Sequence, residues 1–551
     1  MTATTIVLPA QDPARIEIGS LVRPDPGDLG FPTSAPKWDR PPGGSVTFSF
    51  VTAETAPLYN EPDVTGVAPV NANLQNAIRS IFTNLIEPLI PIQFVEVLEN
   101  PSQQGDIRVM LSSLGETADG QAQVPGLDAL AGDVQLSSDI LLGGFASASD
   151  AFAAVGSDNF VTVIHELAHA LGLSHPGNYD GNGTSGNTAG PFLPIGLDHV
   201  MNAVMSYNLA EGDPSPTTYM PYDIQALQYL YGKNTTFNNT DTTYTFSFDP
   251  NNLNNPAAAD FKELNINLAG KRTIWDGGGR DTLNLLGLPV SNYYFDMNPG
   301  GLLTDASARG ASSYEGQASQ QQPGVTYPVD RFGTRIAFDV QVEDLWGTQG
   351  NDEVVGSSVD NFIFVGSGND TVNGNDGADT VSGNQGLDVV NGGNGNDLIV
   401  GGRDSDVLTG GEGNDILNGN IGTDRVEGNN GNDFLFGGQD SDTLIGGEGN
   451  DTLTGDVGQD VLTGNGGSDV YVLRSAAAAP DLAQSDIITD FEVGIDLIGL
   501  TPGATPVLEA TTLNGISGTL IRDGNAGNAI LGFVNNISPE QIGNSYLSVN
   551  L

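Results

Sequence analysis

Three histidines and one glutamate lie close together in the segment HELAHALGLSH, at residues 165–175 of this 551-residue chain. The whole sequence holds only four histidines, and His165, His169 and His175 are three of them. Residues four positions apart on an α-helix share one face, so the first two rings can direct a nitrogen towards one metal ion. Gly172 suits the left-handed backbone that ends many helices, after which the chain can bring in the third ring. The spacing predicts three nitrogen ligands for one zinc ion.

Three protein ligands leave a zinc ion one open position, where bound water loses a proton near neutral pH and becomes a nucleophile. Glu166 projects from the helix in another direction than His165, where it can take the water proton and pass it to a leaving amine. These roles indicate hydrolysis of a peptide bond. An ordinary core helix with structural histidines is the competing interpretation, but five positions of the extended pattern agree. His199 fits no pattern and is predicted to be structural or solvated.

The helix that must position these groups can begin at Asp158, which suits a helix cap, and end before Gly172. Its expected buried side consists of Phe160, Val163, Ile164, Leu167, Ala168 and Leu171. Upstream, residues 45–51 and 106–111 are predicted strands, and residues 72–89 support a helix.

Length and composition narrow the class of protein. A chain of 551 residues suggests about three to four domains. The formal net charge of −50 disfavours nucleic acid and anionic membranes and favours cations, with calcium the obvious candidate. No cysteine is present, which excludes disulfides and thiolate metal sites. No apolar run approaches the length of a membrane helix, and residues 1–15 do not read as a signal peptide.

Residues 347–472 repeat in an unbroken frame of nine, giving fourteen units such as GGEGNDTLT at residues 446–454. The sixth position is aspartate in all units except the one with Asn361, and the eighth is aliphatic or, once, Tyr471. Glycines permit tight turns, aspartates supply oxygen ligands, and the eighth residue points into a thin core. The segment carries 22 acidic and two basic residues, so its folding should depend on calcium. A disordered linker explains the composition but not the register.

The histidine motif, followed by MSY at residues 205–207, resembles the metzincin zinc endopeptidases, and HALGLSHPG at residues 169–177 resembles their serralysin branch. The resemblance implies an α+β metzincin protease domain, with a mixed twisted sheet and an active-site helix, followed by an all-β parallel β-roll domain. It also implies that Met205 forms the floor of the site. By the same match, Tyr207 is a further, displaceable zinc ligand and a catalytic residue that helps to stabilise the oxyanion. Asn208 departs from the family, at a position that concerns packing and substrate contacts.

The nine-residue units resemble the repeats-in-toxin (RTX) β-roll, in which two units form one turn of a parallel coil and calcium lies between turns. The fourteen units would then make seven turns. Three units lack the fourth-position glycine and have Val359, Asp404 or Asp440 instead. The calcium ligands that this match implies in the roll are Gly350, Asp352, Asp370, Asp379, Asp388, Asp397, Asp406, Asp415, Asp424, Asp433, Asp442, Asp451, Asp460 and Asp469.

Other stretches extend the resemblance. Residues 222–228 look like the helix that closes the family's protease domain. Residues 274–281 look like an early calcium turn, and residues 342–344 resemble the entry to the roll. The calcium ligands implied there are Asp276, Gly278, Gly279, Asp281 and Glu343, with surface turn residues as the alternative. Residues 132–136 stand where metzincins have the sheet edge that borders the cleft. An extended peptide could pair with such an edge, which predicts broad substrate choice, and an interior strand is the alternative.

The sequence thus predicts five parts. They are a propeptide-like flexible leader (1–37), a zinc metalloprotease domain (38–232), a β-rich connecting region (233–346), the RTX β-roll (347–472), and a capping region with a C-terminal secretion signal (473–551). The predicted protein is a monomeric, secreted, extracellular zinc endopeptidase that acts on protein or peptide substrates. One zinc ion is catalytic, several calcium ions are structural, and a bacterial one-step (type I) secretion channel exports the chain.

Two rival functions remain open. A calcium-dependent surface or adhesion protein with a vestigial protease domain would explain the extent of the repeats, but the complete ligand set disfavours it. A repeat-bearing lipase is weaker, because the chain has no G-x-S-x-G pattern.

Overall fold

The structure is a computed structural model, which describes residues 3–7, 34–38, 40–41, 43–59, 65–114, 119–125, 131–140, 142, 144–176, 197–208, 210, 213–247, 263–265, 271–314, 326–331, 333–474 and 481–550. The chain forms two compact units. Unit 1 comprises residues 1–242, 248–279 and 299–340, and unit 2 comprises residues 243–247, 280–298 and 341–551. Within the described ranges, no helix is long and apolar enough to cross a membrane.

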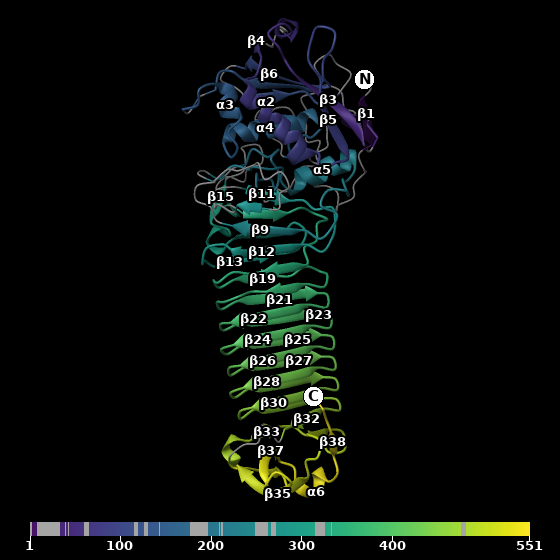
Figure 1. Cartoon of the computed structure of the whole chain (residues 1–551), viewed down its shortest axis with the longest axis vertical. Coiled ribbons are helices and arrows are strands. Elements are labelled where there is room, and N and C mark those ends of the chain that lie inside the picture. The colour runs from purple at the N-terminus through teal and green to yellow at the C-terminus, as the bar shows by residue number, and fades with distance from the viewer. Residues whose placement is uncertain are drawn as a thin grey trace. The chain divides into compact units, whose positions relative to one another are not determined.

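Unit 1 is built on a mixed sheet (Figure 1). Its strands, in spatial order, are β5 (Ile92–Glu96), β3 (Gly44–Phe50), β6 (Ile107–Ser113), β8 (Asp133–Ser137) and β7 (Gly120–Ala122), with β4 (Thr65–Ala68) also paired to β6. The first four run parallel to one another, and β7 is antiparallel to β8. The strands predicted at residues 45–51 and 106–111 are confirmed as β3 and β6.

The sheet edge differs from the prediction. β8, which contains most of residues 132–136, lies between β6 and β7, and all five of its residues are buried. The edge assignment for residues 132–136 was therefore wrong, and the interior alternative holds. Among the described strands, β7 forms this edge. A three-residue strand of Gly, Gln and Ala carries no alternating apolar pattern, so it could not be predicted from its residues.

Helices cover this sheet. α2 (Ala72–Ser80) continues into the π-helical η3 (Ile81–Ile86), where the predicted helix 72–89 ends early. Phe82 anchors this segment on the sheet, with its ring 4.6 Å from that of Phe48 and 4.4 Å from that of Phe94. α4 (Asp158–Ala170) packs against β7 and β8, and α5 (Pro221–Tyr231) follows later in the chain. The position of α4 brings its residues to the open edge of the sheet.

At the N-terminus, β1 (Ala3–Val7) pairs antiparallel with β2 (Ser34–Trp38), and the rest of the predicted leader lies outside the described residues. The remaining elements of unit 1 are η2 (Ala56–Tyr59), α3 (Ala148–Phe152), β10 (Glu263–Asn265), β11 (Lys271–Ile274), β14 (Leu302–Asp305), η5 (Ala306–Ala308), β15 (Ser312–Tyr314), β16 (Tyr327–Val329) and β17 (Gly333–Ile336).

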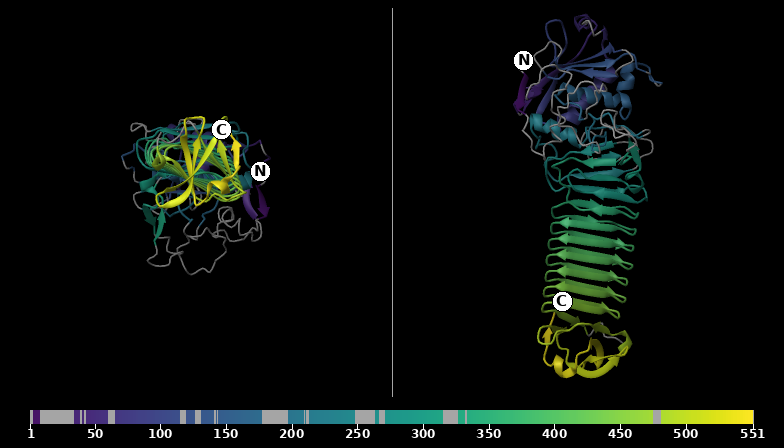
Figure 2. Two further views of the ribbon diagram at one scale, coloured as in Figure 1. Left: turned by 90° about the horizontal axis from the view of Figure 1, so that it is seen from below. Right: turned by 180° about the vertical axis from the view of Figure 1, so that it is seen from behind.

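Unit 2 is a coil of two parallel sheets (Figures 1 and 2). It opens with β9 (Thr243–Ser247), β12 (Thr282–Gly287), β13 (Tyr293–Asp296) and β18 (Asp344–Trp346). The strands of the repeats follow: β19 (Glu353–Val355), β20 (Phe362–Phe364), β21 (Thr371–Asp376), β22 (Thr380–Gln385), β23 (Val389–Asn394), β24 (Leu398–Arg403), β25 (Val407–Glu412), β26 (Ile416–Ile421), β27 (Arg425–Asn430), β28 (Phe434–Gln439), β29 (Thr443–Glu448), β30 (Thr452–Val457), β31 (Val461–Gly466) and β32 (Val470–Leu473).

Each strand pairs in parallel with the strand two further along the chain. Thr371 of β21 is opposite Val389 of β23, for example, and Thr380 of β22 is opposite Leu398 of β24. Two nine-residue units therefore make one turn, and the C-terminal parallel sheets fit the predicted β-roll.

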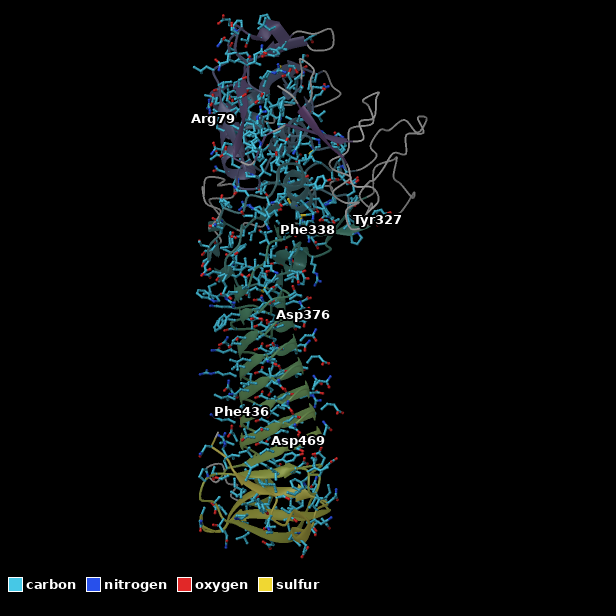
Figure 3. All side chains as sticks on the ribbon, turned by 90° about the vertical axis from the view of Figure 1, so that its right-hand side faces the viewer. Arg79, Tyr327, Phe338, Asp376, Phe436 and Asp469 are labelled. Carbon is cyan, nitrogen blue, oxygen red and sulfur yellow. The ribbon has the colours of Figure 1, made fainter. Side chains whose placement is uncertain are left out.

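Each unit contributes an apolar side chain to the interior of the coil. The eighth residue of every unit is buried, which confirms the predicted core. These residues are Val354, Ile363, Val372, Val381, Val390, Ile399, Leu408, Leu417, Val426, Leu435, Leu444, Leu453, Leu462 and Tyr471. Figure 3 shows the side chains of the coil, with Asp376, Phe436 and Asp469 labelled.

The last strands continue and then cover the coil. β33 (Asp486–Ile488) pairs with β31, and β34 (Leu497–Leu500) pairs with β32. β35 (Pro506–Leu513), β36 (Ile516–Asp523) and β37 (Ala529–Asn535) form an antiparallel meander, followed by α6 (Pro539–Ile542) and β38 (Tyr546–Ser548). The end-on view of Figure 2 shows these segments in yellow across the stack. Such a cover keeps the last apolar layer of a coil from water.

Candidate metal centre

α4 carries two of the three histidines of the motif. Its cap is Ser157, whose hydroxyl oxygen accepts a hydrogen bond from the backbone N–H of Phe160 at 3.1 Å. Asp158, the predicted cap, is instead the first helical residue and accepts a hydrogen bond from Ser215. The helix ends at Ala170, and Gly172 has φ 102°, as expected for a glycine that turns the chain out of a helix.

The three histidine rings converge. Nε2 of His175 lies 3.0 Å from Nε2 of His165 and 3.1 Å from Nε2 of His169. Nδ1 of His165 donates to the carbonyl oxygen of Val204 at 3.1 Å, and Nδ1 of His169 donates to that of Leu173 at 2.7 Å. In neutral rings these donations place the proton on Nδ1 and leave a lone pair on Nε2.

Facing lone pairs repel unless a cation lies between them. Burial, together with the neighbouring His169, lowers the pKa of His165 to about 3. A proton is therefore a poor occupant of this point, and a metal ion with nitrogen ligands fits it. Among the described residues, His165, His169 and His175 form the one group of three side chains whose ligand atoms lie close enough together to hold a metal ion.

Glu166 lies beside the converging rings and against the sheet edge. It is 7% exposed, and burial raises its pKa to about 8, although a backbone hydrogen bond from Ala122 of β7 opposes the rise. A Cβ atom on Gly120 of the same strand would come within 2.7 Å of Cγ of Glu166. The edge strand thus holds this carboxyl group in place.

Tyr207 and Met205 follow in the segment after residue 200. The hydroxyl of Tyr207 lies 2.7 Å from Nε2 of His175, and its ring lies 4.5 Å from the His175 ring. The tyrosine side chain is 48% exposed, so it can move, whereas Met205 is fully buried. Tyr207 therefore lies next to the converging rings on the solvent side, and Met205 lies in the core of unit 1.

Other residues of the motif region have structural surroundings. His199 is fully buried, its Nδ1 accepts a hydrogen bond from the backbone N–H of Met201, and its ring lies 4.8 Å from that of Tyr314. Asn208 donates to the carbonyl oxygen of Asp198 at 2.6 Å. Both residues therefore serve packing.

The predicted early calcium turn falls in both units. In unit 1, the carboxylate of Asp276 accepts from the backbone N–H of Gly278 at 2.8 Å, and Gly278 and Gly279 have φ of 128° and 138°. In unit 2, the carboxylate of Glu343 accepts from the backbone N–H of Asp281 at 2.6 Å. Burial raises the pKa of Glu343. The carboxylates of Asp276 and Glu343 are both buried.

The repeat aspartates form two ladders inside the coil. One carboxylate oxygen, Oδ1, accepts the backbone N–H of the residue eighteen positions earlier, as Asp388 does from Asp370 at 2.9 Å. The other oxygen, Oδ2, is buried and has no hydrogen-bond partner among the described residues. This holds for Asp370, Asp379, Asp388, Asp397, Asp406, Asp415, Asp424, Asp433, Asp442, Asp451 and Asp469.

A buried carboxylate oxygen without a partner costs free energy, and a hard cation is the ligand that removes this cost. The two ends of the ladders differ. Asp352 has both oxygens occupied, by the backbone N–H groups of Tyr293 and Thr348. At the other end, Asp460 and Asp469 donate backbone N–H groups to Asp486 and Asp496. Gly350 packs against the carbonyl oxygen of Ser291, where a Cβ atom has no room.

Sequence reasoning missed two residues of the site. Gly120 was missed because β7 has no apolar pattern. Asp223, whose carboxylate accepts the backbone N–H groups of Val204 and Met205, was missed because this turn is distant from it in sequence. Pro221 and Asp223 together predict a helix N-terminus. They do not indicate which other backbone groups the carboxylate of Asp223 binds.

Comparison with known proteins adds two findings. The model of the RTX calcium-binding nonapeptide repeat matches residues 346–381, 373–408, 400–435 and 436–471. The metallopeptidase AprA of Pseudomonas marginalis is 31% identical over 214 residues, which cover 37% of this chain and 38% of the relative. Serralysin of Proteus mirabilis is 31% identical over 216 residues, 38% of each chain, and serralysin C of Dickeya chrysanthemi is 29% identical over 200 residues, 35% of each.

The chain thus spans less than two fifths of the length of these curated relatives. It resembles serralysin-type metalloproteases and carries RTX calcium-binding repeats.

Proposed function

We propose that this chain is a secreted zinc-dependent endopeptidase whose repeats bind calcium. The observation that carries the proposal is the convergence of three Nε2 lone pairs, from His165, His169 and His175, at separations of 3.0 and 3.1 Å. The similarity to serralysin-type enzymes supports the same assignment.

The protein groups divide the work of peptide hydrolysis. Zinc, when bound by the three rings, supplies Lewis-acid activation of a water molecule. Glu166 accepts the proton of the attacking water and returns it to the leaving amine, and its raised pKa suits a group that must both accept and donate. The hydroxyl of Tyr207, displaced from His175, donates to the oxygen of the scissile carbonyl as negative charge develops on it.

We expect the substrate to bind along the exposed side of β7. An extended peptide that pairs with this edge is held by backbone hydrogen bonds, which read little sequence. The scissile bond would then lie beside Glu166, because β7 already contacts that side chain. We therefore expect broad substrate choice among unfolded or flexible protein segments.

The repeats supply calcium-dependent folding outside the cell. Calcium is scarce in cytoplasm, so the coil would stay unfolded until the chain has left through a bacterial one-step (type I) channel and then fold as a monomer. The buried, unpartnered Oδ2 atoms are the chemical basis of this dependence.

A calcium-dependent surface or adhesion protein is the second candidate. The aspartate ladders favour it, because they need calcium whether or not unit 1 is active. Zymography on casein, with and without a zinc chelator, separates the two. A cleared band that the chelator abolishes supports the protease, and its absence from zinc-loaded protein supports the rival.

The decisive variant is Glu166→Ala, with Glu54→Ala at an exposed position as its control. Removal of the general base should lower kcat by a factor of about 10² to 10⁴, with zinc content and circular dichroism unchanged. The control should retain full activity. Normal casein hydrolysis by Glu166→Ala would refute the assigned role.

A further inference from the structure

A buried carboxylate lies behind the metal centre and belongs to none of the groups above. Asp223, the third residue of α5, is fully buried. Its Oδ2 accepts the backbone N–H of Val204 at 2.6 Å and that of Met220 at 3.0 Å. Its Oδ1 accepts the backbone N–H of Met205 at 3.4 Å. One carboxylate therefore ties the N-terminus of α5 to the turn at Val204 and Met205.

This turn borders the histidines on two sides. The carbonyl oxygen of Val204 accepts Nδ1–H of His165, and Tyr207, two residues after Met205, places its hydroxyl at His175. The carboxylate thus acts on groups of the metal centre through a single turn of backbone.

The geometry of one peptide group makes the connection specific. In a trans peptide the C=O and N–H bonds point in opposite directions. The group between Val204 and Met205 directs its N–H to Asp223 and its C=O to His165. It is clamped between them, and rotation of this plane would remove the acceptor that keeps the His165 proton on Nδ1.

A carboxylate is required here because both of its oxygens only accept hydrogen bonds. It can therefore receive the N–H groups of both Val204 and Met205. Burial raises the pKa of Asp223 to about 7, although the backbone N–H groups of Val204, Met220 and Met205 oppose the rise. The positive end of the α5 dipole also favours the charge.

We propose that Asp223 is a positioning residue for the metal centre. It fixes the plane of the Val204–Met205 peptide and through it holds His165 with the Nε2 lone pair directed at the metal. The inference rests on the proposed zinc site. Its direct consequence is a change in the affinity for zinc, and a change in activity follows from that.

The test is Asp223→Asn in the full, calcium-loaded chain. The amide has one acceptor oxygen fewer and sets an NH₂ group against a backbone N–H. We expect the Kd for zinc, measured by chelator competition, to rise about 10- to 100-fold, as for other partners of metal ligands. Turnover should fall in kcat, with KM little changed.

Asp106→Asn is the matched control. Asp106 is also buried, and its carboxylate accepts the backbone N–H of Thr47 at 2.8 Å, but it directly precedes β6, and its carboxylate is bonded to Thr47 and Arg40 rather than to the metal centre. The control should lose stability and keep the zinc Kd. An equal Kd in the folded forms of both variants would overturn the inference. If the wild type itself binds no zinc, the proposed function fails first.

If the Asp223→Asn variant does not fold, the inference can be tested on the wild type. Hydrogen exchange, followed by mass spectrometry of peptides from the zinc-free protein, should find the amides of Val204 and Met205 as protected as those of α4. Rapid exchange at both amides would overturn the clamp, because a hydrogen bond to a fully buried carboxylate prevents it.

Discussion

The hydroxyl oxygen of Tyr207 lies 2.7 Å from Nε2 of His175, the atom on which the other two histidines also converge. The tyrosine is nearly half exposed while His165 and His169 are buried, so the mobile member of the centre faces solvent and substrate. A hydroxyl in this position can leave the centre when a carbonyl oxygen arrives and donate a hydrogen bond to it.

Tyr207→Phe should separate the metal-binding role from the catalytic one. The three rings remain, so zinc content should be unchanged, while loss of a donor to the developing oxyanion should lower kcat about 10²-fold. Steady-state kinetics on a fluorogenic peptide measures the effect. Tyr229→Phe on α5 is the control, and equal kinetics for the two variants would remove Tyr207 from the mechanism.

Gly120→Ala, at the sheet edge, should displace the side chain of Glu166, the proposed general base. The new Cβ atom would lie 2.7 Å from Cγ of Glu166 and 2.7 Å from Cγ2 of Thr162, so the carboxyl group must shift. We expect kcat to fall about tenfold or more, because a misplaced base loses much of its contribution. Gln121→Ala, at the exposed neighbour in β7, should keep kcat; a fall of the same size there would point to the strand as a whole.

Trp38→Phe should destabilise unit 1, because Trp38 is hydrogen-bonded to the C-terminal end of α4. The indole N–H of Trp38 donates to the carbonyl oxygen of Ala170 at 3.0 Å, and Tyr231 donates to that of Leu171 at 2.7 Å. Loss of the buried donor should lower the free energy of unfolding by about 1–3 kcal/mol in urea denaturation. Trp346→Phe, in unit 2, should leave the unfolding of unit 1 unchanged. The same contact requires that any removal of the leader stop before Trp38.

Low pH should stabilise the coil in the absence of calcium. Burial raises the pKa of Asp379 and Asp415 to about 7 and that of Asp442 to about 8, above the ordinary value of 3.8. The calcium-free coil is therefore most stable at low pH and loses stability as pH rises from about 4 to 8, since the unfolded chain ionises first. Circular dichroism of the calcium-free chain should therefore show more β-structure at pH 4 than at pH 8, and added calcium should restore it at pH 8. Equal β-structure at the two pH values without calcium would contradict the burial of free carboxylates.

Asp415→Asn should remove calcium from the coil without removing its hydrogen bonds. The amide oxygen can still accept the N–H of Asp397, but the orphaned Oδ2 is gone. We expect less calcium per chain by atomic absorption and a lower melting temperature in calcium. Asp376→Asn, at an exposed position bonded to Asn394, is the control and should change neither. Equal calcium content in both variants would place the ions elsewhere.

Much of this protein could be predicted from local spacing. The period of nine fixed the buried eighth residues from Val354 to Tyr471, because each unit contacts only its neighbours and every unit meets the same surroundings. The i, i+4 spacing of His165 and His169 fixed the shared direction of two rings, because helix geometry depends on the backbone alone.

Only the tertiary structure decided which distant segments complete the centre. Whether β8 or β7 forms the sheet edge depends on pairing between strands, and β7 has no pattern of its own. That Asp223 holds the Val204–Met205 peptide, and that Ala122 bonds to Glu166, follows from packing between elements that the sequence separates. Local periodicity specifies the ligands because it repeats within a few residues, whereas the groups that orient them are chosen by long-range contacts that leave no period in the chain.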